Sequence, residues 1–450
     1  MRKLSHLPLF VIIGAFVVLV QTPFFAQRTG YSKEEFMRRR TALMNSCRDG
    51  MIILFGDGLP SPGHHFRQEN DFFYFTGVED LNAIVAMTPQ TGQSYLFVPQ
   101  QSAREKMISG MNVLERGGGK EKTGFTDILP VAYFEEFVAR NVKRSGLVFH
   151  LRLSPRDDIT DDRWETLIFL ARKNRSPFDN QLSLDSYRLQ KLRDSYPVVT
   201  FKDLAPAIDQ MRVIKTAEEI DIMRRNGRIS AEGVKQAMLA SMPGGFEYEI
   251  EAAAVGTVMK SGAKGAAYAP IVGSGPNTCV LHYDENSRQV QDGDLILMDF
   301  GADLDHLCMD ITRTWPANGK FTPEQKEVYQ IVLEIEKACI EAYRPGATTE
   351  DVQRHVAEVM KKKGLDPRDQ RGGFGHHVGL ATHDGGPQER ILKEGMVFAI
   401  EPALYYPEKN LGIRIEDTVL ITANGCEILT RDVPKEIDEV EKLLASRKIK

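Results

Sequence analysis

Residues 295–310 read LILMDFGADLDHLCMD, and this stretch decides the fold of the second half of the chain. The apolar run from Leu295 to Met298 ends in Asp299, and a second aspartate, Asp310, follows 11 residues later. A turn between Gly301 and Asp305 lets the two flanking runs pair as a hairpin. Because side chains alternate between the faces of a strand, this spacing can place both carboxylates on one face. We therefore predict a β-hairpin that presents two acidic side chains together.

Other acidic residues occupy similar positions near the C-terminus. The apolar run 397–400 ends in Glu401, and residues 412–417 read GIRIED. Period-2 alternation sends Arg414 and Glu416 to one face of that strand. His376 lies in a glycine-flanked stretch, HHVGLATHD, at residues 376–384.

Burial is expected at these positions, and an ionised acid buried without a partner costs several kcal/mol. Four carboxylates carry a charge of −4, which two divalent cations balance, and a bound hydroxide then leaves −1. Hard oxygen donors with one imidazole suit Mn²⁺, Co²⁺ or Zn²⁺ in a bridged pair. Two ions about 3.5–4 Å apart lower the pKa of a bridging water toward about 7. The residue types therefore predict a dinuclear hydrolytic site formed by Asp299, Asp310, His376, Glu401 and Glu416.

The rest of the chain predicts an α/β (α+β) protein with two domains, at residues 31–197 and 204–441. In the first domain, we expect a helix at 133–142 and strands at 51–55, 71–77, 83–87, 94–98 and 147–153. In the second, Thr216 and Glu219 form a capping box that predicts a long helix. We expect further helices at 246–261, 322–345 and 348–363, and strands at 294–300, 306–315, 396–400 and 412–421.

Composition excludes several functional classes. The chain has 450 residues, of which 42% are hydrophobic and 26% charged, proportions typical of a globular protein. With 57 basic and 62 acidic side chains, its net charge of −5 provides no general cationic surface for nucleic acid. The five cysteines form no CxxC pair and do not indicate a disulfide framework, although a single bridge stays open.

The N-terminus has the layout of an export signal. Arg2 and Lys3 precede an apolar run from Leu7 to Val20, as in the n-region and h-region of a secretory signal. We therefore expect a periplasmic or extracellular protein. Cleavage after Ala26 would place Phe24 where a small residue is usual, so residues 1–26 are either a cleaved signal or an uncleaved membrane anchor.

Six ordered motifs resemble the pita-bread metallopeptidases, and within them the Xaa-Pro aminopeptidase and prolidase branch. Residues 66–77 resemble the N-terminal domain of aminopeptidase P, so the resemblance covers nearly all of the mature chain. It implies a smaller N-terminal α/β domain followed by a pita-bread catalytic domain. The six motifs lie at residues 211–219, 270–283, 299–314, 376–384, 401–402 and 412–417.

The resemblance also implies roles for single residues. Asp299 would bind one ion, Asp310 and Glu416 both ions, and His376 and Glu401 the other, with Mn²⁺ as the expected metal. Glu401 would also act as general base toward the attacking water. The remaining implied site residues are His282 and His383, which contact the substrate carbonyl and stabilise the oxyanion, Arg414, which holds a ligand carboxylate, and Tyr405, which lines the substrate pocket.

We therefore expect an exported dinuclear aminopeptidase that hydrolyses the N-terminal Xaa-Pro bond of peptides by a metal-bridged hydroxide. A prolidase, which demands a dipeptide, is the alternative. A non-catalytic peptide-binding homologue is disfavoured because all five ligand positions are present. Leu307 and Gly372 stand where relatives often carry Tyr and His, so the strictness of proline specificity stays open. The resemblance further implies a homo-oligomer, either a dimer or a tetramer.

Overall fold

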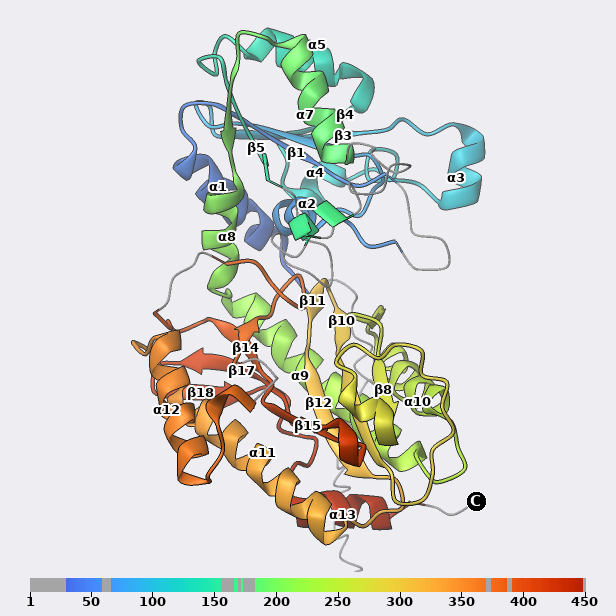
Figure 1. Ribbon diagram of the computed structural model, residues 1–450. Coiled ribbons are helices and arrows are strands. Elements are labelled where there is room, and N and C mark those ends of the chain that lie inside the picture. Colours follow the sequence, from blue (N-terminus) through green and yellow to red (C-terminus); the bar gives the residue numbers. More distant parts are fainter. Residues whose placement is uncertain are drawn as a thin grey trace, which may run out of the picture.

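The computed structural model describes residues 30–58, 66–154, 166–168, 171–172, 183–369, 374–386 and 391–447. Figure 1 shows two lobes, which meet near α8, Ala205–Val213. The predicted signal or anchor at residues 1–26 lies outside the described residues, and so does Gly372. Within the described ranges, the structure contains no helix that is both long and apolar enough to cross a membrane.

The N-terminal lobe is built on a six-stranded mixed sheet of order β4-β3-β2-β1-β5-β6 (Figure 1). Alternate residues of its central strand β1 face two different cores. Met51 and Ile53 pack with α5 and α7, whereas Ile52 and Leu54 pack with α1 and α2. The strands are β1 Met51–Phe55, β2 Ile84–Thr88, β3 Gln93–Val98, β4 Asp127–Pro130, β5 Val148–Leu151 and β6 Thr200–Asp203. The helices are α1 Lys33–Ser46, α2 Asn70–Thr76, α3 Ala103–Ser109, α4 Gly119–Thr123, α5 Phe134–Asn141 and α7 Leu184–Ser195.

The strand predicted at residues 71–77 is wrong, because this segment forms the helix α2. The Glu69 carboxylate caps the helix by accepting a hydrogen bond from the Phe72 N–H, at 2.7 Å. Gly77 ends it in the left-handed conformation, with φ of 64°. All seven residues of α2 are buried, so its continuous aromatic run shows neither helical nor strand periodicity.

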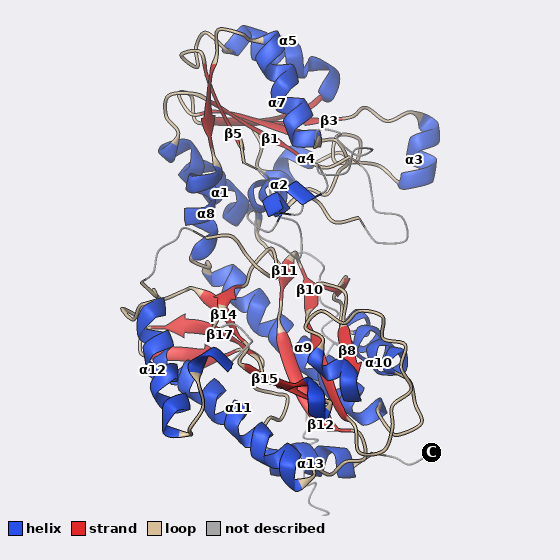
Figure 2. Cartoon of the chain, viewed as in Figure 1, coloured by secondary structure: helices blue, strands red, loops and turns tan. Residues whose placement is uncertain are grey.

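The helices predicted in the C-terminal lobe are confirmed (Figure 2). The long α9 begins after Thr216, whose hydroxyl accepts from the Glu219 N–H while the Glu219 carboxylate accepts from the Thr216 N–H. Thr322 caps α11 in the same way, with proline at the first helical position. The helices of this lobe are α9 Ala217–Ala240, α10 Glu247–Lys260, α11 Pro323–Ala342, α12 Thr349–Lys362 and α13 Ile437–Ala445.

The strands between these helices form small sheets rather than one large one (Figure 2). The predicted antiparallel pairing is confirmed, since β9 pairs with β12 and Asp299 lies opposite Thr312. The turn predicted between Gly301 and Asp305 is wrong, because residues 302–304 form the strand β10, which pairs with β11, and the chain turns at Asp305 and His306. Two predicted strands are interrupted, the strand at 306–315 between Cys308 and Ile311 and that at 412–421 between Arg414 and Asp417. The strands are β7 Gly265–Ala266, β8 Ile271–Ser274, β9 Leu295–Phe300, β10 Ala302–Leu304, β11 Leu307–Cys308, β12 Ile311–Pro316, β13 His376–His377, β14 Val397–Ile400, β15 Ala403–Tyr406, β16 Leu411–Arg414, β17 Asp417–Thr422 and β18 Gly425–Ile428.

Both interruptions occur at predicted metal ligands. The β12 strand starts one residue after Asp310, and β16 ends two residues before Glu416. In place of a continuous ladder, the Glu416 N–H donates to the Thr312 carbonyl at 3.0 Å. The chain thereby leaves regular pairing where the acidic side chains must turn toward a common point.

One buried apolar cluster joins the two lobes. It contains residues of α1, α2 and β1 from the N-terminal lobe together with Leu307, Met309 and Leu380 from the C-terminal lobe. Because the same core supports both, the N-terminal lobe is packed against the segments that lead to the predicted site.

A substitution pair tests the packing at the β9–β12 hairpin. A Cβ added at Gly301 would lie 1.6 Å from the Met309 carbonyl oxygen, so the two backbones must separate. We expect Gly301→Ala to lower the thermal midpoint measured by calorimetry, at a cost of about 1–3 kcal/mol or more. Gly256→Ala in α10 is the matched control, because nothing lies within 4 Å of its added Cβ. It should stabilise by about 0.5–1 kcal/mol, and equal behaviour of the two variants would contradict the packing described.

Candidate metal centre

Three of the predicted carboxylates converge from separate strands. Single oxygen atoms of Asp299, Asp310 and Glu416 lie within 4.8 Å of one another. Asp299 is in β9, Asp310 precedes β12 and Glu416 lies between β16 and β17. Asp310 and Glu416 are only 4% and 1% exposed, so water hardly solvates either carboxylate.

A second group forms around Asp310. The ligand atoms of Asp310, His376 and His383 also lie within 4.8 Å of one another. The His376 Nε2 is 3.5 Å from an Asp310 oxygen and 3.7 Å from a Glu401 oxygen. The His383 ring stands edge-on to that of His376, with centroids 4.2 Å apart. Asp310 thus belongs to both groups. Glu401 is in neither group, but it lies next to His376 of the second.

The electrostatics of the cluster require positive charge. Burial, followed by the charge of Asp299, raises the pKa of Asp310 well above its usual range. Burial and the Asp310 charge do the same for the pKa of Glu416. Desolvation lowers the pKa of His376 to about 3, so this imidazole is neutral and has a lone pair to offer at neutral pH. The cluster is therefore unfavourable as a set of ionised acids alone.

Arg414 supplies one compensating charge from within the protein. Its Nη2 contacts Asp299 at 2.5 Å, its Nε donates to Thr312 at 3.0 Å, and its Nη1 donates to the Tyr405 hydroxyl at 2.9 Å. Although burial lowers it, the pKa of Arg414 is raised above its usual value by Asp299. Arg414 and Tyr405 thus lie beside the cluster, but one guanidinium cannot balance several carboxylates.

Two side chains that the motifs did not single out complete the surroundings. The Thr312 hydroxyl donates to Glu416 at 2.6 Å. The Tyr268 hydroxyl is within hydrogen-bond distance of both Asp299 and Asp310. A phenol has one hydrogen, so it cannot donate to both acids at once, and a proton or cation must relieve the remaining oxygen contact. Oxygen-rich donors, two imidazoles and this unrelieved contact fit divalent ions.

His282 is the predicted residue that the structure does not bring into this group. It is exposed, in the segment that follows the short 3-10 helix Gly275–Cys279. It makes no hydrogen bond, ion pair or ring contact with the rest of the described chain. The helix itself packs against β16, where the Gly412 N–H donates to the Thr278 hydroxyl at 2.9 Å.

An α/β lobe followed by a lobe whose strands converge on carboxylates and imidazoles defines a metallopeptidase of the pita-bread class. Residues 221–423 match the model of metallopeptidase family M24, and residues 36–149 match the aminopeptidase P N-terminal domain. The Xaa-Pro aminopeptidase of Escherichia coli strain K12 is 32% identical over 457 residues, covering 93% of this chain and 99% of that protein.

Solved structures agree with this assignment. Aminopeptidase P from Escherichia coli with the inhibitor Pro-Leu has a TM-score of 0.79 at 30% identity, covering 92% of this chain and 99% of that one. Proline aminopeptidase P II from Yersinia pestis has a TM-score of 0.77 at 30% identity, covering 92% and 100%. The chain belongs to metallopeptidase family M24, as an enzyme of the aminopeptidase P type, and this family implies divalent metal ions.

The hydroxyl of Thr312 provides a test of how the carboxylates are held. Thr312→Val keeps the shape of the side chain but removes the donor to Glu416 and the acceptor for Arg414. We expect divalent-metal affinity to fall about 10–100-fold, measured by competition with a chelator. Thr314→Val is the matched control, because Thr314 is equally buried in β12 but bonds only the Arg414 backbone. Equal losses in both variants would contradict a specific role for Thr312.

Proposed function

We propose that this protein is a dinuclear aminopeptidase that removes the N-terminal residue from peptides with proline in second position. The observation that carries the proposal is the membership of Asp310 in two adjacent groups of ligand atoms. A carboxylate shared in this way suits two neighbouring ions. The names of the relatives, which are Xaa-Pro aminopeptidases, support the substrate class.

The proposed ligands of the ions are Asp299, Asp310, Glu416, His376 and Glu401. In support, Asp299, Asp310 and Glu416 form the first group, the second consists of Asp310, His376 and His383, and a Glu401 oxygen lies 3.7 Å from the His376 Nε2. When bound, two divalent ions would supply Lewis acidity and lower the pKa of water toward neutrality. We propose Mn²⁺ as the native metal, with Co²⁺ or Zn²⁺ as alternatives.

Glu401 is proposed as the general base. It lies directly after β14, and its side chain is 25% exposed, so its carboxylate faces the site without being sealed from substrate. An oxygen of this residue would take the proton of the attacking water. Its neighbour His376 is neutral, because desolvation lowers the pKa of this imidazole to about 3. It therefore forms no ion pair with the Glu401 carboxylate.

His383 and His282 are proposed to stabilise the oxyanion that forms when the peptide carbonyl is attacked. His383 is only half-buried and stands against His376, so its ring can reach a carbonyl oxygen next to the cluster. His282 is exposed and would have to approach with the substrate. Tyr405, fixed through Arg414, would limit the pocket on the other side of Asp299.

A substrate panel tests the function. Xaa-Pro-Xaa peptides, Xaa-Pro dipeptides and Xaa-Ala-Xaa controls are incubated with enzyme that has been stripped by chelation and reloaded with Mn²⁺, Co²⁺ or Zn²⁺. We expect release of the first residue from the proline tripeptides, and loss of turnover by about 10²–10⁴-fold in Glu401→Gln with unchanged thermal stability. Cleavage of dipeptides alone would indicate a prolidase, and wild-type rates in Glu401→Gln would refute the assigned base.

We also propose that the protein is exported and assembles as a homo-oligomer. The support for export is the charged and apolar layout of residues 1–26, and the support for assembly is the family resemblance. N-terminal sequencing of protein isolated from its native host should find a mature chain that begins near Gln27 outside the cytoplasm, or an intact chain in the membrane fraction. An intact chain recovered from the cytosol would contradict export.

A further inference from the structure

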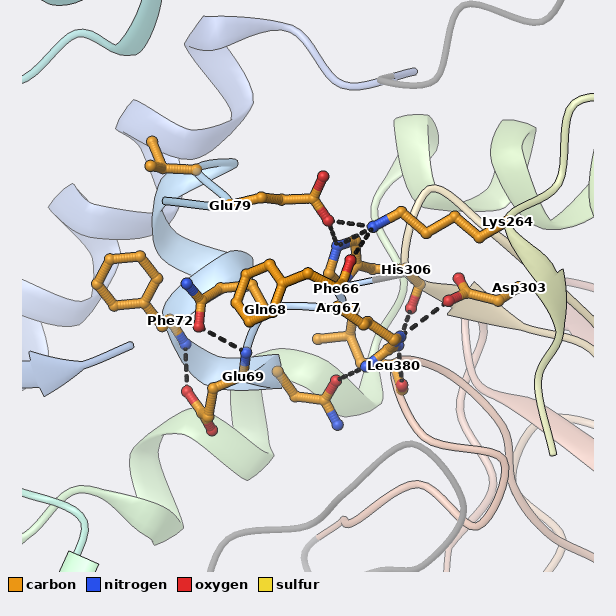
Figure 3. A network of polar contacts seen from close by, with 12 residues as sticks. Phe66, Arg67, Gln68, Glu69, Phe72, Glu79, Lys264, Asp303, His306 and Leu380 are labelled. Carbon is orange, nitrogen blue, oxygen red and sulfur yellow. Dashed lines mark hydrogen bonds and ion pairs between the residues drawn. The ribbon is translucent and has the colours of Figure 1, made fainter. Parts of the chain in front are cut away.

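Arg67 lies in the N-terminal lobe, three residues before the start of α2, and its side chain contacts the C-terminal lobe (Figure 3). Its Nη2 donates to the carbonyls of Leu380 and His306, at 2.6 and 2.9 Å. Its Nε donates to the Asp303 carboxylate at 2.9 Å, and its Nη1 to the Asn70 side chain at 2.5 Å. The Arg67 side chain is 14% exposed and that of Asp303 3%. One guanidinium therefore ties together two backbone segments that are 74 residues apart in sequence, at 306 and 380.

The first of these segments, residues 378–384, carries His383. The Gly379 carbonyl accepts from the Cys308 N–H at 2.7 Å. At the other end, the Asp384 carboxylate accepts from Arg212 at 2.5 Å and from Lys215 at 3.0 Å. His383, the proposed oxyanion-stabilising side chain, thus lies on a short stretch that cationic residues from outside it hold on both sides. Of these contacts, the hydrogen bond from Arg67 to the Leu380 carbonyl comes from the N-terminal lobe.

The second segment is the tip of the β10–β11 hairpin, which leads into Asp310. Its two turn residues, Asp305 and His306, have φ of 53° and 67°, although neither is glycine. Such backbone conformations cost free energy and persist where the surroundings fix them. Here the His306 ring stacks on Phe73, with centroids 3.5 Å apart, and its Nε2 lies 2.7 Å from a Glu79 oxygen. Figure 3 shows Glu79, Lys264 and His306 grouped beside Arg67.

We propose that Arg67 is a positioning residue of the catalytic site. By joining the Leu380 and His306 carbonyls, it fixes segment 378–384 against the hairpin and so holds His383 beside His376. The inference rests on the proposed function, because it uses the role of His383 toward the substrate carbonyl. A planar guanidinium can address two carbonyls and a carboxylate at once, whereas the ammonium of lysine has neither the reach nor the geometry to do so.

A double-mutant cycle with His383 tests the proposal. We expect Arg67→Ala to lower kcat about 10–100-fold, because small displacements of a catalytic group cost about this much, with KM changed less than about threefold. His383→Ala should lower kcat about 10²–10³-fold. In the double variant, Arg67→Ala should cause no further loss, since the group it positions is gone. Arg67→Lys can still pair with Asp303 but cannot join the two carbonyls, so it should lose kcat much as Arg67→Ala does.

Arg40→Ala is the matched control. Arg40 is also buried and also joins two backbone carbonyls, those of Phe75 and Thr123, but both lie in the N-terminal lobe. It should lower thermal stability and leave kcat of the folded enzyme unchanged. An equal loss of kcat in the Arg40 variant, or a loss from Arg67→Ala that persists undiminished in the His383→Ala background, would overturn the proposal.

Hydrogen exchange supplies a readout that needs no turnover. Peptides covering residues 378–384 should exchange faster in Arg67→Ala than in the wild type, and should be unaffected in Arg40→Ala. Unchanged exchange in Arg67→Ala would overturn the proposal whatever the kinetics. If the wild-type enzyme cleaves no peptide of the panel, the proposed function fails, and the exchange data still decide whether Arg67 holds this segment.

Discussion

The mutual repulsion of buried carboxylates is the constraint on which the rest of this structure depends. Asp299, Asp310 and Glu416 are brought together from three places in the chain, and each ionised acid placed in a protein interior costs several kcal/mol. The net stability of a folded domain is only about 5–15 kcal/mol, so the ionised form of such a cluster is tolerable only with positive charge beside it. Arg414 provides a single charge next to Asp299. Divalent ions, which the family implies, would offset the negative charge that remains. The same ions would then both stabilise the C-terminal lobe and take part in catalysis.

The same constraint explains why the lobes share one core. Carboxylates that repel one another are held in place only if their strands cannot separate. The hairpin before Asp310 and the segment before Asp384 both pack against α2 and its neighbours in a common apolar cluster. A buried chain of charges, running from Arg152 through Asp71 and Arg212 to Asp384, crosses the same boundary. The N-terminal lobe thus helps to hold in place the segments that carry the site residues.

Much of the fold could be predicted because its signals are local. The capping boxes at Thr216 and Thr322 and the proline at the start of α11 each act within one helical turn. The pairing of β9 with β12 followed from spacing, but the short strands β10 and β11 between them did not. The segment from Asp71 to Gly77 failed because burial on every side removed its periodicity, and the decisive features were a glutamate cap and a left-handed glycine. The interruptions beside Asp310 and Glu416 could not be foreseen, since regular alternation gives no sign of where a strand must stop to turn an acid inward.

The residues of the candidate site also fall into those that the sequence reveals and those that only the tertiary structure reveals. Asp299 and Glu401 follow apolar runs, and that position is visible in a sequence. Tyr268, Thr312 and Arg67 depend instead on which strand lies opposite which, a relation set by the tertiary register. Tyr268 is 31 residues from Asp299 yet its hydroxyl contacts that carboxylate, and Arg67 is 313 residues from the Leu380 carbonyl that it binds. A sequence therefore reveals the groups that perform the chemistry more readily than those that hold them. The contacts of Arg67 also join the two lobes, so they cannot be deduced from either lobe taken alone.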